Sequence, residues 1–470
     1  MNKILLIRPA SNLLKNLPLG LLYLSSYLKK KFGNDIEVSI ADFRLRGTTN
    51  PKEIEITLSE FGPDIIGITS LSVEIKETLE LARFIKDKFP DAKLIIGGPL
   101  ASSEHELLEQ FNIFDHIVVG EGEEALSSIV NGDIDASRRI LFAHDFREVD
   151  MNYIDYPDYN FVNVSDYFHM DSHEAFQIHK AAVPIFTSRG CPFNCSFCLH
   201  MFGKKVRFRN IENVIAEITH LVTRYNVREL HIEDDIFNVK KERMILFFNL
   251  LKQKNISLKI AFPNGLKYDF LDEEIIRLFK INGVFHVCLG IESVSEKIMD
   301  VLSKKHNLKK LTETISLLSK YNILAHGYFI TGLPDENIDD LRVSLEYANK
   351  SKLHHYSIFK YIPFKKTSLF EKYASILSIA DIDRVEGANY HYSNMNFSNI
   401  NNATLDKLLK KNIYRFYFSP VRIFNTFLAI DTRTLLRKLY IFIYYLFTGK
   451  VYFGEKRNYT GWYNPDFTSK

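Results

Sequence analysis

The chain has 470 residues, too many for one ordinary domain, so two or three domains are expected. A hydrophobic content of 46% and a charged content of 25% are typical of a globular protein, and a net charge of +3 argues against a bulk nucleic-acid binder. The four cysteines do not form a disulfide framework, which favours a reducing cytoplasm. The N-terminal apolar run is too short for a signal peptide, and the longest apolar run, Leu439–Phe447, is about half of a membrane span.

Residues 1–135 alternate short apolar runs with segments of helical periodicity, which predicts a doubly wound, flavodoxin-like or Rossmann-like α/β domain. Strands are expected near 3–8, 36–41, 64–69, 93–97 and 115–119. Helices are expected near 18–31, 51–61, 74–88, 103–111 and 122–130. The strand ends carry small and polar residues, which are either tight turns or places where glycine lets the backbone approach a large ligand.

Four motifs of this segment together resemble the cobalamin-binding domain that precedes many radical SAM (S-adenosylmethionine) barrels: Pro18-Leu19-Gly20-Leu21, Gly67-Ile68-Thr69-Ser70, Gly97-Gly98-Pro99 and Gly120-Glu121-Gly122-Glu123. The resemblance implies cobalamin contacts at Leu19, Thr69, Ser70, Leu71, Gly97, Gly98, Glu121 and Gly122. The family's Asp-x-His-x-x-Gly motif corresponds here to Asp42-Phe43-Arg44-Leu45-Arg46-Gly47. Because Arg44 has no lone pair to give a metal, cobalt is expected to lack a histidine ligand; the alternative is a domain that binds no cofactor.

Residues 136–182 have little periodicity and many Asp, Tyr and Asn residues, which predicts an ordered linker. It contains three irregularly spaced histidines, His169, His173 and His179. Since acidic partners at ligand spacing are missing around them, we interpret these histidines as surface or interface residues and not as metal ligands.

Residues 183–373 contain six βα repeats, which predicts a partial (β/α)6 TIM-like barrel, open on one side. Strands are expected near 183–187, 229–233, 258–262, 285–290, 323–329 and 354–360. Helices are expected near 211–225, 239–253, 272–282, 295–302, 307–320 and 337–350. Catalytic groups in such barrels lie at the carboxyl ends of the strands.

The first of these strands is followed by Cys191, Cys195 and Cys198 in a CxxxCxxC pattern. Thiolates select Fe–S clusters, Zn²⁺ or Cu⁺, and three cysteines leave one iron of a [4Fe-4S] cluster without a protein ligand. The alternatives are a zinc knuckle with His200 as its fourth ligand, or three unligated cysteines. Cys288 stands alone within a predicted strand, where a cysteine is usually a small core residue.

The run Thr187-Ser188-Arg189-Gly190-Cys191, with Phe197 before the third cysteine, resembles the signature of radical SAM enzymes. The resemblance implies that the cysteines hold the cluster and that one electron cleaves SAM to a 5′-deoxyadenosyl radical. Later strand ends resemble family elements too, and the SAM contacts so implied are Phe197, Glu233, Asp234, Asp235, Asn264, Glu292, Ser293, Gly327 and Gly332.

Two of these strand ends need comment. The adjacent acids at 233–235 need a cation or a donor opposite them, such as a charged ligand group; the alternative is a solvated helix N-terminus. The run Pro363-Phe364-Lys365-Lys366-Thr367-Ser368-Leu369 resembles the family's Pro-x-x-Gly-Thr-x-Leu element, with Lys366 in place of glycine, so that turn is expected to differ in shape.

Residues 374–470 predict an aromatic-rich helical region with basic residues beside its apolar faces. It is either a cap on the barrel or a surface that contacts a membrane peripherally.

Together these features predict a cobalamin-dependent radical SAM methyltransferase that methylates an unactivated carbon of a small or lipid-like metabolite. Its electron donor would be a protein such as flavodoxin or ferredoxin. One alternative is oxidative cyclisation or rearrangement with the same cofactors, and another is a non-catalytic Fe–S or zinc protein. No catalytic base can be assigned.

Overall fold

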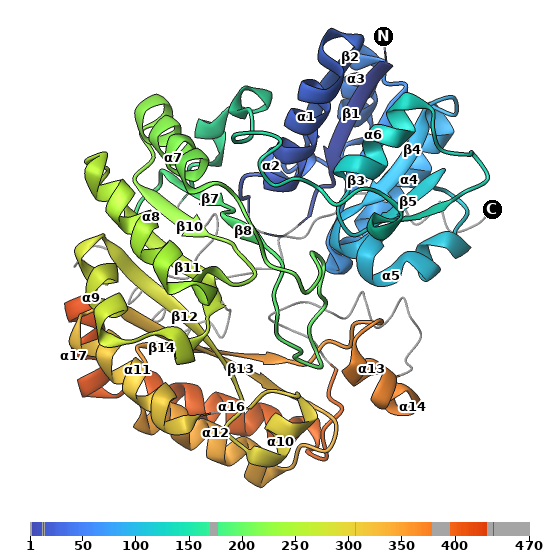
Figure 1. The fold of residues 1–470 in the computed structure, drawn as a ribbon. Coiled ribbons are helices and arrows are strands. Elements are labelled where there is room, and N and C mark those ends of the chain that lie inside the picture. The colour runs from blue at the N-terminus through green and yellow to red at the C-terminus, as the bar shows by residue number, and fades with distance from the viewer. Residues whose placement is uncertain are drawn as a thin grey trace. The chain divides into compact units, whose positions relative to one another are not determined.

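The computed structural model describes residues 2–11, 13, 15–169, 177–305, 307–377, 395–429 and 436. The chain divides between residues 173 and 174 into two compact units. Each unit contains a six-stranded parallel sheet with helices packed along it (Figure 1). The predicted α/β architecture, with a doubly wound domain followed by a partial barrel, is therefore confirmed.

The first unit has the strand order β2-β1-β3-β4-β5-β6, a flavodoxin-like order extended by one strand. Its strands are β1 (Asn2–Arg8), β2 (Ile36–Asp42), β3 (Ile65–Thr69), β4 (Lys93–Gly97), β5 (His116–Val119) and β6 (Ile140–Phe142). Its helices are α1 (Leu19–Phe32), α2 (Phe43–Arg46), α3 (Pro51–Phe61), α4 (Ile75–Lys88), α5 (Gly98–Gln110) and α6 (Glu123–Asn131).

Local sequence explains where these helices begin and end. In α3 the side chain of Asn50 accepts a hydrogen bond from Lys52 N–H, Pro51 occupies the first turn, and Gly62 ends the helix with a φ of 63°. Helix α5 begins at Gly98, earlier than expected, because Pro99 suits the first turn of a helix and a kink at Glu104 joins this turn to the expected segment.

Strand β6 corrects the expectation of a linker over residues 136–182. Ile140 pairs in parallel with Ile117 of β5, and Leu141 is fully buried. A three-residue strand is too short to show a period in the sequence. The buried Tyr167, whose hydroxyl donates to Asp42 over 2.8 Å, also belongs to the first unit. His173 lies outside the described residues.

The second unit has the strand order β14-β13-β12-β11-β10-β7, in which neighbours in the sequence are neighbours in the sheet. This sheet is the predicted six-stranded open barrel. Its strands are β7 (Ala182–Ile185), β10 (Glu229–Ile232), β11 (Lys259–Leu266), β12 (Val284–Glu292), β13 (Leu324–Thr331) and β14 (His355–Lys360). Its helices are α7 (Ile211–Tyr225), α8 (Lys241–Gln253), α9 (Glu273–Ile281), α10 (Glu296–Val301), α11 (Leu308–Lys320) and α12 (Ile338–Lys350).

The described part of the C-terminal region is helical and packs on the barrel. It comprises α13 (Ser368–Lys372), α14 (Ala374–Leu377), α16 (Asn402–Tyr417) and α17 (Pro420–Ala429). Asn412 of α16 donates to the Tyr356 hydroxyl of β14 over 3.0 Å, and the buried Arg422 of α17 donates to carbonyls around Ser351. Among the described helices none is long and apolar enough to cross a membrane. The apolar run at 439–447 lies outside the described residues.

Candidate active site

The cysteine loop begins at a short antiparallel ribbon, β8 (Ser188–Arg189) with β9 (Arg207–Phe208). Gly190 leaves this ribbon with a φ of 92°, and a Cβ atom there would lie 2.3 Å from the carbonyl oxygen of Lys205. Its N–H donates to Oδ2 of Asp235 over 2.8 Å. Only glycine fits this position, so the path of the chain into Cys191 is fixed.

The far side of the loop is fixed by Ser196, which is buried between Cys195 and Cys198. Its N–H donates to Leu302 O over 2.9 Å and its hydroxyl donates to Val301 O over 2.8 Å. Its own carbonyl accepts from Leu369 N–H over 2.9 Å. The end of α10 and the start of α13 therefore hold the loop in place.

Cys191 and Cys195 are partly buried and Cys198 reaches the surface; desolvation by the surrounding protein is the largest cause of a raised pKa at each of the three thiols. For Cys198 the neighbouring thiols of Cys195 and Cys191 raise it further, as does Asp235. Thiols that resist ionisation need a cation to stabilise their thiolates, and a bound metal deprotonates such thiols outright. This donor set fits a [4Fe-4S] cluster held by three cysteines.

The three acids after β10 have different contacts. The buried carboxylate of Asp234 accepts from Thr187 N–H over 2.6 Å, from Thr187 Oγ1 over 2.5 Å and from Ser188 Oγ over 2.6 Å. The backbone carbonyl of Glu233 accepts from the Asn264 amide over 2.7 Å. Protein donors therefore face Asp234, while Asp235 faces the cysteine loop.

The end of β12 brings opposite charges together. Lys304 Nζ donates to Gly290 O over 2.6 Å and to Glu292 Oε1 over 3.0 Å, and both side chains are mostly buried. Glu292 has a φ of 62°, in a region that a β-branched or bulky residue rarely adopts, next to a register shift between β12 and β13. Lys304 lowers and Glu292 raises the pKa of Cys195, so the pair lies near the loop sulfurs.

Ser293 and Gly327 lie deeper than expected for ligand contacts. The Ser293 hydroxyl is 3.0 Å from that of Ser344 on α12 and accepts from Ser295 N–H over 3.1 Å. A Cβ atom on Gly327 would lie 2.9 Å from the Leu353 side chain and 3.0 Å from that of Ile291. Ser293 therefore contacts α12, and Gly327 packs against side chains of β12 and of the loop before β14.

Sequence reasoning missed Glu336, in the loop after β13. Its buried carboxylate accepts from Gly332 N–H over 2.6 Å and from Thr331 Oγ1 over 3.0 Å. Burial raises the pKa of Glu336 to about 7. No sequence motif marks Glu336. Its carboxylate is held by the hydroxyl of Thr331 and the backbone N–H of Gly332, and such contacts within a turn leave no residue pattern to recognise.

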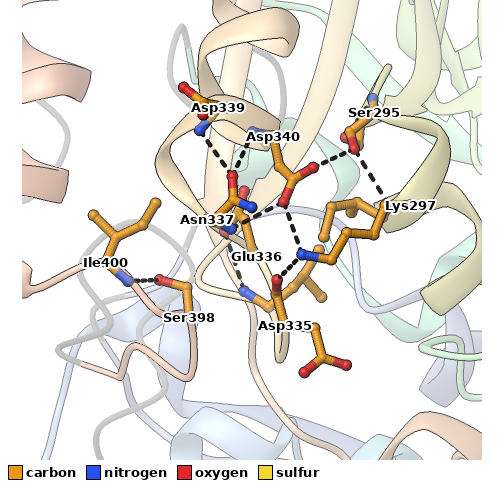
Figure 2. Close-up of polar contacts among 12 residues, drawn as sticks. Ser295, Lys297, Asp335, Glu336, Asn337, Asp339, Asp340, Ser398 and Ile400 are labelled. Atoms are coloured by element: carbon orange, nitrogen blue, oxygen red, sulfur yellow. Dashed lines mark hydrogen bonds and ion pairs between the residues drawn. The ribbon is translucent and has the colours of Figure 1, made fainter.

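Figure 2 shows how the same loop continues into α12. Asn337 accepts from Asp340 N–H over 3.0 Å and Asp340 accepts from Asn337 N–H over 3.0 Å, a reciprocal cap. Asp340 also accepts from Ser295 over 2.6 Å and from Lys297 over 3.2 Å. The loops after β12 and β13 are therefore linked.

Two further expectations concern packing. Phe197 contacts the apolar cluster that contains Leu302, Leu333 and Leu369. Lys366 adopts a φ of 69°, a left-handed conformation of the kind glycine favours, and the expected difference in turn shape stays a prediction.

In the first unit, the strand ends are joined through small residues. Gly98 has a φ of 82°, and a Cβ atom there would lie 2.5 Å from Thr69 Oγ1. Leu100 N–H donates to Ser70 O over 2.9 Å, and Gly120 N–H donates to Ser102 Oγ over 3.0 Å. Leu19 is buried, whereas Thr69, Leu71, Gly97, Gly98, Glu121 and Gly122 are partly exposed. This edge presents backbone and small side chains.

Arg44 lies at this edge in a buried ion pair with Glu74. The second oxygen of Glu74 accepts from Leu71 N–H over 2.9 Å, which ties the pair to the end of β3. Beside it, Arg8 donates to Asp42 over 3.0 and 2.5 Å. These residues fit a corrin that receives no metal ligand from this motif, because a guanidinium cannot coordinate cobalt.

Comparison with known families matches each unit separately. The B12 binding domain model matches residues 13–130, and the Radical SAM superfamily model matches residues 185–348.

Comparisons of the whole chain give relatives that align along most of its length. The chain is 26% identical to "Uncharacterized methyltransferase PH0819" of Pyrococcus horikoshii, over 86% of this chain and 88% of that protein. It is 24% identical to the anaerobic magnesium-protoporphyrin IX monomethyl ester cyclase of Rubrivivax gelatinosus, over 78% and 68%. The fold is similar to that of TsrM from Kitasatospora setae, a radical SAM methyltransferase solved with cobalamin and a [4Fe-4S] cluster bound, with a TM-score of 0.66, 16% identity and 92% of each chain covered.

Proposed function

We propose that this chain, which is a radical SAM enzyme with an N-terminal B12-binding domain, transfers a methyl group to an unactivated carbon of a small or lipid-like molecule. Its cofactors are a [4Fe-4S] cluster, SAM and cobalamin. When bound, the cluster and SAM supply the means to remove a hydrogen atom from carbon, and cobalamin supplies the methyl group. The observation that carries the proposal is the presence of both cofactor domains in one chain that aligns along most of its length with a methyltransferase.

The cysteine loop performs the metal-binding part of this function. Cys191, Cys195 and Cys198 would hold three irons and leave the fourth open to SAM. Gly190 and Ser196 keep the loop in place through contacts to Asp235, α10 and α13.

The SAM contacts are proposed to divide into two groups. Glu292 and Asp235 carry carboxylates next to the thiols, where the ammonium group of SAM needs an acceptor, and Lys304 beside Glu292 suits its carboxylate. Residues whose contacts are internal would position those groups: Phe197, Glu233, Asp234, Asn264, Ser293, Gly327 and Gly332.

The cobalamin contacts are proposed at the carboxyl edge of the first sheet. The residues are Leu19, Thr69, Ser70, Leu71, Gly97, Gly98, Glu121 and Gly122. With Arg44 in the family's histidine position, cob(II)alamin bound to the protein should show no nitrogen splitting from a histidine in its electron paramagnetic resonance spectrum. Such a splitting would contradict this arrangement.

Oxidative cyclisation or rearrangement with the same cofactors is the second candidate, and the likeness to a cyclase favours it. The product mass separates the two functions. Substrate candidates would come from metabolites that accumulate in a deletion strain, and the reconstituted enzyme would receive them with SAM that carries a trideuterated methyl group. Methyl transfer predicts a product that retains deuterium from that methyl group. Substrate-dependent formation of 5′-deoxyadenosine, with loss of hydrogen from the product and no label, would overturn methyl transfer in favour of cyclisation.

We also propose an electron donor and a contact for the exposed apolar residues of the C-terminal helices. Cleavage of SAM needs an electron, for which a flavodoxin or ferredoxin is the proposed donor. Helix α17 exposes Val421, Phe424 and Leu428, which suits peripheral contact with a membrane or with a lipid-like substrate. A cytoplasmic location stays a prediction.

A further inference from the structure

Three metal-ligating side chains meet inside the barrel, away from the loop thiols in sequence. They are His286 and Cys288 of β12 and His326 of β13, and each is at most 3% exposed. Cys288 and His326 are direct partners in the register of the two strands, and His286 precedes Cys288 by two residues on the same face. The strand pairing therefore creates a cluster that the sequence spacing does not reveal.

The cluster lies on the inner face of the open barrel. Phe262 of β11 pairs with Val287 and stacks on Phe279 of α9 with ring centroids 5.3 Å apart, so that face carries the helices. Successive side chains of a strand point to opposite faces, which places His286 and Cys288 on the face away from the helices. Cys288 lies one inward position before Gly290, whose carbonyl holds Lys304.

The distances between the ligand atoms match one face of a zinc tetrahedron. His286 Nε2 and His326 Nδ1 are 3.3 Å apart, and Cys288 Sγ is 3.7 Å from each of them. With ordinary Zn–N and Zn–S bond lengths, a tetrahedral site separates two nitrogens by about 3.3 Å and a nitrogen from sulfur by about 3.6 Å. Hydrogen bonds within the triangle explain the same distances without a metal, and the experiment below distinguishes these two interpretations.

The ring of His326 is already oriented for ligation. Its Nε2 is 2.9 Å from Ser357 Oγ on β14, which directs Nδ1 toward His286 and Cys288. A partner on the second ring nitrogen is the usual arrangement of a metal-binding histidine.

We propose that His286, Cys288 and His326 bind a thiophilic divalent cation of the Zn²⁺ type. This site is additional to the [4Fe-4S] cluster and does not depend on the proposed methyl transfer. Three protein ligands leave the fourth position of a tetrahedral metal open to water or to a substrate heteroatom, as in zinc sites that handle substrates.

The test uses the full chain in which Cys191, Cys195 and Cys198 are all alanine, so that the loop cannot bind metal. Titration with Co²⁺ should give one equivalent of tightly bound metal with a thiolate-to-cobalt charge-transfer band. Cys288→Ser in this background should remove the band, and His326→Gln should weaken binding. His355→Gln is the matched control, since His355 lies beside His326 with ring centroids 4.3 Å apart but is outside the triangle.

The cluster-loaded wild-type protein, purified without added zinc, should also contain one equivalent of zinc beside its iron. Absence of the band in a background whose circular dichroism matches that of the wild type would overturn the proposal. Persistence of the band in Cys288→Ser would do the same. Both readouts are independent of SAM cleavage, so failure of the proposed function would leave them unchanged.

Discussion

The carboxyl edges of the two sheets differ in what they present. In the first unit the edge consists of backbone groups and small residues around Gly98, and its charged side chains are paired internally, as in Arg44 with Glu74. In the second unit the edge carries three thiols with Asp235 and Glu292 beside them. Two parallel sheets of different strand order therefore present different chemistry at the same edge, small groups suited to a large ligand in one and soft and charged groups in the other.

Removing the thiols should have the largest effect on the second edge. With Cys191, Cys195 and Cys198 all changed to alanine, iron should fall to background and 5′-deoxyadenosine formation should stop, because the loop then offers no thiolate to a cluster. Iron analysis and product chromatography measure this. Cys288→Ser should keep the iron and sulfide content of the wild type. SAM cleavage by the triple variant would refute the assignment of the loop as the cluster site.

Removal of the buried ion pair between Arg44 and Glu74 in the first unit should have the next largest effect, a loss of stability. Arg44→Met leaves the carboxylate of Glu74 buried without its cation and should lower the free energy of unfolding by about 4 kcal/mol. The exposed neighbour Arg46 is the control, and Arg46→Met should cost less than about 0.5 kcal/mol. Equal effects in chemical denaturation would show that the pair does not stabilise the edge.

Each edge depends on a glycine, Gly98 in the first unit and Gly190 in the second. The two glycines differ in the atom that an added Cβ would meet. Gly190→Ala should cost about 3 kcal/mol, because the new Cβ meets a backbone carbonyl at a positive φ. Gly98→Ala should cost about 2 kcal/mol, since the nearest obstacle is the movable hydroxyl of Thr69. Gly203→Ala, where nothing lies within 4 Å, should cost about 1 kcal/mol. Denaturant unfolding would measure all three, and any other ranking would contradict this difference.

An effect similar in size to that of Gly98→Ala is expected from the pH dependence of the second edge. Burial raises the pKa of Glu336 from 4.5 to about 7, so the folded state holds this proton more tightly than the unfolded state. Its contribution to stability is therefore present at low pH and is lost as pH rises from 4.5 to 7. Relative to Glu336→Gln, the wild type should lose about 2 kcal/mol of unfolding free energy between pH 5 and pH 8. A constant difference across this range would show that the pKa is not raised.

Apolar periodicity predicted the long elements of both sheets because each alternates with a helix. It failed for β6, since Ile140–Phe142 is too short to show a period and its pairing depends on β5. It also could not show that β11 continues to Leu266.

Motifs placed the site residues at the strand ends but not the direction of each side chain. Asp234 accepts hydrogen bonds from Thr187 and Ser188, and Gly327 packs against Leu353. These are tertiary contacts, and the spacing of residues along the sequence does not predict them. Cys288 was interpreted as a core residue because its partner His326 is brought near only by strand register.

Two arginines, Arg209 and Arg243, donate hydrogen bonds to the backbone just after β7. Two acids, Glu217 and Asp234, balance their formal charges. Arg209 pairs with Glu217 over 2.5 Å and donates to Phe186 O over 2.6 Å, with both charged side chains almost fully buried. Arg243 donates to Thr187 O over 3.0 Å. Burial lowers the pKa of Arg243, and the negative charge of Asp234 raises it. Because one lost partner would leave an unbalanced buried charge, these positions should change in pairs during evolution. In an alignment of homologues, Glu217 should co-vary with Arg209, and a lineage that replaces one with an apolar residue should replace the other.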